Sequence, residues 1–256
     1  MLPTIARRSG ILAFVLVFAA CGDGPVTPPS TTAYTDAELR HFSDLVFGSD
    51  AAAGVVRKWT APIRVAFEGE PTAADGSVLA ATLQEIADAS RGGLDLGMAA
   101  DGEEPNMVFH VVPRAVAEEI EPDIERWHIG YFRVWWRGDG SFARARIILV
   151  ADGISSQTRG YIVRHEVMHA VGFMQHAPRD RGSIMYESWS GTSRFSGLDL
   201  AAMEMLYRSD VAPGMQSGTA LALLRGLPAG SRSLGVPIDA GREALFTEGH
   251  GIAAGH

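Results

Sequence analysis

The sequence of 256 residues has little of three things: cysteine, excess positive charge and long apolar runs. With a single cysteine, no intramolecular disulfide can form. Acidic residues outnumber Lys and Arg by 30 to 22, and a net charge of −8 argues against a general nucleic-acid binder, which clusters basic residues. With 46% hydrophobic residues, the composition excludes a mainly disordered chain and supplies at least one sizeable core.

A run of ten apolar residues, 11–20, follows two arginines near the N-terminus. Since about 20 residues are needed to cross a bilayer as a helix, this run predicts an export signal rather than a membrane anchor. Phe18-Ala19-Ala20-Cys21 resembles the lipobox of bacterial lipoproteins. The resemblance implies a cleaved signal over 1–20, a lipid anchor on Cys21 and, with Gly22 next, attachment to the outer membrane of the cell envelope. The alternative is an ordinary signal peptide with an incidental cysteine.

The remaining chain divides by composition into three parts. Residues 21–33 are rich in proline and turn formers, which predicts a flexible tether. Residues 34–213 carry alternating helical and strand patterns and are expected to form one domain, and 214–256 are expected to be an accessory or partly disordered tail. The patterns predict helices near 35–46, 79–92, 155–173 and 198–207, and strands near 63–67, 107–112, 132–136 and 145–150.

The segment with the most candidate catalytic and metal-binding residues lies on the third predicted helix and starts with His165-Glu166-Val167-Met168-His169. At 3.6 residues per turn, His165 and His169 lie about 40° apart on one face and about 6 Å apart along the axis, so both imidazoles can bind one metal. Glu166 lies at the flank of that face, where it can take a proton from a water on the metal. The pattern indicates zinc-dependent hydrolysis, although two histidines at this spacing also occur by chance.

Three later residues strengthen this interpretation. Gly172 comes seven residues after His165, where a helix can end in a left-handed turn and the chain can reverse. His176 then follows as a candidate third ligand, and Met185 comes nine residues after it in Ser183-Ile184-Met185-Tyr186.

Together these residues resemble the metzincin clan of zinc metallopeptidases, with features of astacins before residue 173 and of matrixins at 183–186. The resemblance implies three zinc ligands, a general base, a turn glycine and a buried Met-turn, which correspond here to His165, His169 and His176, then Glu166, Gly172 and Met185. It also implies an α+β fold, in which a twisted mixed sheet packs on the active-site helix and a small C-terminal subdomain carries a further helix.

The sequence departs from the clan at one position. The clan has its third histidine ten residues after the first, and here that residue is Gln175, with His176 one step later. His176 is the expected ligand because imidazole binds zinc far better than a carboxamide, while Gln175 and Glu204 are the alternatives. Tyr186 is a candidate catalytic residue that stabilises the oxyanion, or else a packed aromatic.

The expected function is that of a zinc endopeptidase with one Zn²⁺ per chain and Glu166 as general base. Its partners would be a protein or peptide substrate and, through Cys21, a membrane, but no nucleic acid. Residues 132–136 are the candidate edge strand for pairing with extended peptide. The alternative is a binding or adhesion lipoprotein of the envelope on an inactive zincin scaffold.

Overall fold

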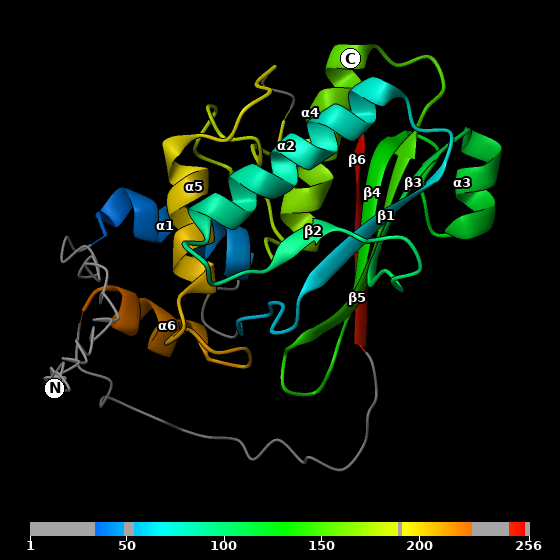
Figure 1. Cartoon of the computed structure of the whole chain (residues 1–256). Coiled ribbons are helices and arrows are strands. Elements are labelled where there is room, and N and C mark those ends of the chain that lie inside the picture. Colours follow the sequence, from blue (N-terminus) through cyan, green and yellow to red (C-terminus); the bar gives the residue numbers. More distant parts are fainter. Residues whose placement is uncertain (1–33, 49–53, 189–190, 227–245, 254–256) are drawn as a thin grey trace, which may run out of the picture. The chain divides into compact units, whose positions relative to one another are not determined.

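The computed structural model of the protein describes residues 34–48, 54–188, 191–226 and 246–253 (Figure 1). The predicted export signal, the lipidation site Cys21 and the tether over 21–33 lie outside these residues. Within the described ranges, no helix is both long enough and apolar enough to cross a bilayer.

In these ranges, six strands form one mixed sheet in the order β2-β1-β3-β5-β4-β6. The strands are β1 (Ile63–Gly69), β2 (Leu96–Met98), β3 (Met107–Val112), β4 (His128–Trp136), β5 (Phe142–Val150) and β6 (Phe246–Ala253). Strands β2, β1, β3 and β5 are parallel, whereas β4 pairs antiparallel with both of its neighbours. The helices are α1 (Asp36–Phe47), α2 (Ala73–Ala89), α3 (Arg114–Ile120), α4 (Ser156–Ala170), α5 (Gly197–Tyr207) and α6 (Ser217–Leu224).

Local sequence fixes where three of the helices begin. Thr35, Thr72 and Ser196 each accept a hydrogen bond from the backbone three residues on, and the acidic side chain at that position bonds back to the cap. Such reciprocal capping satisfies two backbone donors that a helix start would otherwise leave unpaired. The predicted start of α1 is thereby confirmed.

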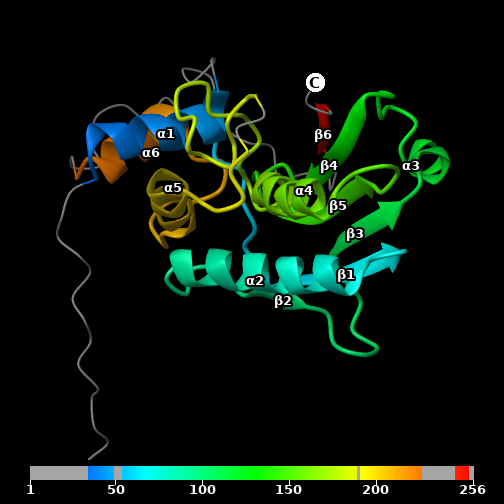
Figure 2. The same cartoon turned by 90° about the horizontal axis from the view of Figure 1, so that it is seen from above.

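The helices divide unequally between the two faces of the sheet (Figure 2). Helices α2 and α4 lie on one face, where the main core gathers alternate strand residues such as Phe109 and Val111, whereas α3 covers the other face with a smaller cluster that includes Val112. Helices α1, α5 and α6 group beyond the sheet, at the C-terminal end of α4 (Figures 1 and 2). The predicted mixed sheet packed on the helix with His165 and His169 is confirmed.

Three details differ from the sequence-based expectations. The helix predicted to reach residue 173 ends at Ala170, because the chain turns at Gly172 with φ +132°. The expected edge strand at 132–136 is not an edge, since β6 pairs along β4 and covers its backbone groups. The core also continues past residue 213, because Ala220 and Leu224 of α6 are buried in it.

Candidate metal centre

Helix α4 carries the first two histidines of the site, and its end is fixed by side chains from elsewhere in the chain. Trp59 Nε1 donates a hydrogen bond to the Ala170 carbonyl at 2.9 Å, and Tyr207 Oη donates to the Val171 carbonyl at 2.6 Å. Both carbonyls belong to the end of a helix, where no backbone N–H is left to pair with them. These two buried bonds therefore hold the end of α4 in place.

Gly172 is required at the turn that follows α4. Its φ of +132° is one that L side chains rarely adopt, and a Cβ at this residue would lie 2.8 Å from Leu206 Cδ2 and 3.0 Å from the Arg57 carbonyl oxygen. The turn sends the chain back toward α4, so that the Phe173 carbonyl accepts a hydrogen bond from His169 Nδ1. The glycine therefore helps to orient a ligand as well as to reverse the chain.

Three histidine nitrogens converge at one point. The Nε2 atoms of His165 and His169 are 3.0 Å apart. The Nε2 atom of His176 lies 3.2 Å from that of His165 and 3.3 Å from that of His169. Zinc–imidazole bonds of about 2.0–2.1 Å at tetrahedral angles place two ligand nitrogens about 3.3 Å apart. The described residues thus bring together three groups that could hold a metal ion.

The hydrogen bonds at Nδ1 decide which nitrogen is available to a metal. His165 Nδ1 lies 2.8 Å from the Ile184 carbonyl oxygen, and His169 Nδ1 bonds to the Phe173 carbonyl. A carbonyl only accepts, so each Nδ1 carries the proton and each Nε2 presents a lone pair. Burial and the nearby His176 ring lower the pKa of His165 to about 3, so this imidazole is neutral. With the protons on Nδ1, the Nε2 lone pairs of both rings face one another and can bind one cation.

The one-residue shift of the third histidine is absorbed by the loop after α4. The Ala177 N–H donates to the Met185 carbonyl at 2.7 Å, which ties the residue after His176 to the predicted Met-turn. The neighbouring Gln175 donates its backbone N–H to the Leu45 carbonyl of α1, and its side chain packs beside Gly48. Of these two neighbours, His176 is the one whose side chain meets His165 and His169.

Glu166 is buried, at 1% exposure, and neither carboxylate oxygen has a hydrogen-bond partner among the described residues. Burial raises the pKa of this carboxyl well above its usual value. A buried carboxyl without partners is costly to folding, and such groups cluster at functional sites. Its place directly after His165 and its readiness to take a proton suit a general base.

Three other residues considered for the site, Met185, Tyr186 and Glu204, differ in burial and in the groups that they contact. Met185 is fully buried in the turn, and Tyr186 is half-buried with Arg181 over its ring at 5.9 Å. The alternative ligand Glu204 is wrong on geometry: it accepts a hydrogen bond from Tyr34 and pairs with Arg91, and it is outside the histidine cluster. The oxyanion role of Tyr186 stays a prediction.

The sequence reasoning missed three residues that contact the histidines or the turn behind them. Tyr161 Oη lies 3.3 Å from His165 Nδ1, and Phe132 stacks on His169 with ring centroids 4.3 Å apart. Asp199 bonds to the turn at Ser183 and Ile184. Only Tyr161 had a local signal, since it lies one helical turn before His165.

Residues 36–226 match the family model described as a protein of unknown function, DUF2927. The chain belongs to the DUF2927 family. No curated protein matches the sequence of this DUF2927 member. Among solved structures, the crystal structure of myroilysin is similar with a TM-score of 0.35 and 16% sequence identity, over 64% of this chain and 95% of that chain.

Proposed function

We propose that the protein is a zinc-dependent endopeptidase of metzincin-like architecture. The observation that carries the proposal is the meeting of three histidine Nε2 atoms at 3.0–3.3 Å, two of them from α4. The same helix holds the buried Glu166, whose carboxylate has no hydrogen-bond partner in the described ranges. A purely structural zinc site does not need a carboxyl that can take a proton, because its four protein ligands leave no position for a reacting water.

In the proposed reaction, the histidines bind the metal and Glu166 transfers the proton. His165, His169 and His176 would hold the metal, and a bound Zn²⁺ supplies Lewis acidity and a water of lowered pKa. Glu166 takes the proton of the attacking water at a carboxylate oxygen and returns it to the leaving amine. Burial of Glu166 suits this role, since a carboxyl with a raised pKa is a stronger base. The Nδ1 hydrogen bonds keep two of the rings oriented.

The location and the substrate remain part of the proposal. We place the protein in the bacterial envelope, anchored through lipidated Cys21, with a protein or peptide as substrate; these assignments rest on the sequence alone. Because β6 pairs with β4 from His128 to Trp136, the described structure does not offer β4 to an extended peptide as an edge strand.

The test measures metal content and cleavage of an unfolded, fluorescently labelled protein by the same purified samples. We expect about one zinc per chain, cleavage that a chelator abolishes, zinc and cleavage both lost in His176→Ala, and cleavage alone lost in Glu166→Gln. Zinc without cleavage would favour the inactive binding lipoprotein, and absence of zinc after reconstitution would reject the metal centre.

A further inference from the structure

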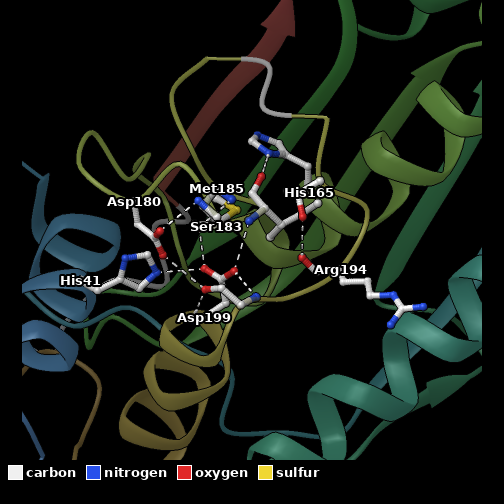
Figure 3. Close-up of polar contacts among 11 residues, drawn as sticks. His41, His165, Asp180, Ser183, Met185, Arg194 and Asp199 are labelled. Atoms are coloured by element: carbon white, nitrogen blue, oxygen red, sulfur yellow. Dashed lines mark hydrogen bonds and ion pairs between the residues drawn. The ribbon is translucent and has the colours of Figure 1, made fainter.

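Asp199, in the first turn of α5, is buried at 0% exposure and accepts four hydrogen bonds (Figure 3). Oδ1 accepts from His41 Nε2 at 2.9 Å and from Ser183 Oγ at 2.6 Å. Oδ2 accepts from the backbone N–H groups of Ile184 at 3.1 Å and Ser196 at 2.8 Å. An ionised carboxylate offers about four acceptor positions, so this side chain is fully satisfied.

Asp199 bonds to residues 183 and 184 of the segment 183–187, called the 183–187 turn, which contacts His165 and the residue after His176. The Ile184 peptide donates its N–H to Asp199, and the Ile184 carbonyl accepts from His165 Nδ1 at 2.8 Å. Next to it, the Met185 carbonyl accepts from the Ala177 N–H, which follows His176. Two of the three candidate ligands therefore depend on the position of this turn.

Helix α1 supports the same turn from the outside. His41 is 4% exposed, and its Nε2 is the donor because a carboxylate only accepts. The Leu45 carbonyl of α1 accepts the Gln175 N–H at 3.0 Å, and Asp44 pairs with Arg179. The first described helix thus contacts the segment with His176 as well as Asp199.

We propose that Asp199 and His41 are positioning residues of the metal centre, which fix His165 and His176 through the 183–187 turn and link metal affinity to the docking of α1. This inference rests on the proposed metal-dependent function. Its physical reason is that a ligand imidazole is oriented by the bond at its other nitrogen, and loss of such outer partners typically weakens metal binding about 10- to 100-fold.

The test measures zinc affinity of the full chain by competition with a chelating dye, together with the absorption spectrum of the Co²⁺-loaded protein. We expect Asp199→Asn to weaken zinc binding about 30-fold and to shift the Co²⁺ bands, because an amide cannot accept from all four donors. His41→Leu should weaken binding about 10-fold, and His41→Gln, which keeps a donor, should recover most of that loss. Ser183→Ala is the milder variant if Asp199→Asn does not fold.

Asp75→Asn is the matched control. Asp75 is also the acidic member of a capping box, is 2% exposed and pairs with Arg159 of α4. It does not bond to the 183–187 turn. Asp75→Asn should therefore lower the melting temperature while zinc affinity and the Co²⁺ spectrum stay those of the wild type.

The outcomes separate the two proposals. If the wild type binds zinc and Asp199→Asn, His41→Leu and Ser183→Ala bind it equally tightly, the positioning role is overturned whether or not the protein cleaves peptides. If Asp75→Asn weakens binding as much as Asp199→Asn, the effect is general destabilisation and the inference also fails. A wild type that binds no zinc rejects the metal centre and this inference together.

Discussion

The two sides of the histidine cluster each have a buried carboxyl group, and their surroundings are opposite. On the α4 side, Glu166 is 1% exposed and has no hydrogen-bond partner among the described residues. On the α5 side, Asp199 is 0% exposed and accepts four hydrogen bonds. Within the ranges that the structure describes, one buried acid is therefore fully hydrogen-bonded and the other has no hydrogen-bond partner.

Because of this difference, the pKa values of Glu166 and Asp199 shift in opposite directions. Burial alone acts on Glu166 and raises its pKa well above the usual value. Burial also acts to raise the pKa of Asp199, but hydrogen bonds from His41, Ser183 and the Ser196 N–H outweigh it, so that the pKa of Asp199 lies below its usual range. A satisfied carboxylate stabilises a structure, whereas an unsatisfied one is available for chemistry.

The largest effect is expected from Glu166→Gln. The variant removes the proposed base, so cleavage should fall on the order of 1,000-fold while zinc content is unchanged. Because the lost carboxyl has no hydrogen-bond partner in the described part of the chain, the melting temperature should not fall. Cleavage within threefold of the wild type would contradict the assigned role, and a lower melting temperature would contradict the comparison.

Asp199→Asn should instead lower the free energy of unfolding, by about 3 kcal/mol, because it breaks a buried and fully bonded charge. Urea unfolding of both proteins from pH 7 to pH 3 measures this. Since the folded pKa of Asp199 is below the unfolded value of about 3.9, the stabilisation is present above that value and is lost as pH falls through the folded pKa. The wild-type advantage should shrink below about pH 4; an advantage that stays constant would contradict the pairing.

Gly172→Ala should cost about 2 kcal/mol, because the residue has φ +132° and a Cβ would crowd Leu206 and the Arg57 carbonyl. Gly160→Ala is the matched control on α4, since its Cβ would meet only Val78, at 3.8 Å. That control should instead stabilise the helix by about 0.5–1 kcal/mol. Equal effects of the two variants in thermal unfolding would contradict a special conformation at Gly172.

The smallest effect on stability is expected from the exposed ion pair between α1 and the loop that holds His176. Arg179, which is 68% exposed, pairs with Asp44 on the outside of the loop that holds His176. Exposed ion pairs contribute little and are screened by salt. Arg179→Ala should change the melting temperature less than Asp199→Asn or Gly172→Ala, and high salt should remove the difference. An effect as large as that of Asp199→Asn would show that the exposed Arg179–Asp44 pair contributes as much to stability as the buried hydrogen bonds of Asp199.

Much of the site was predictable because it depends on local periodicity. The spacing of His165 and His169 follows from helix geometry, and Gly172 from the conformational freedom of glycine. The capping box at Thr35 and the strands 107–112 and 145–150 were also readable, since caps and alternating apolar residues have short-range signatures. The short strand β2 and helices α3 and α6 had too few residues for a clear pattern.

Other features could not be predicted, since they join residues that are far apart in the chain. His41 and Asp199 are 158 positions apart, and no local pattern marks them as partners. The pairing of β6 with β4 likewise joins distant segments, and the alternation of 132–136 does not indicate whether another strand covers that side of β4.

The sequence by itself determined the chemical types present: two histidines and a glutamate on one helical face, a glycine that can end the helix, and a third histidine within reach. Only the tertiary structure decided that His176 rather than Gln175 meets the other two. It also decided that, among the residues with described positions, Glu166 has no hydrogen-bond partner and Asp199 has four donors. The reason is physical, since side-chain chemistry and helical phase are local properties, whereas burial and hydrogen-bond partners depend on which distant segments pack together.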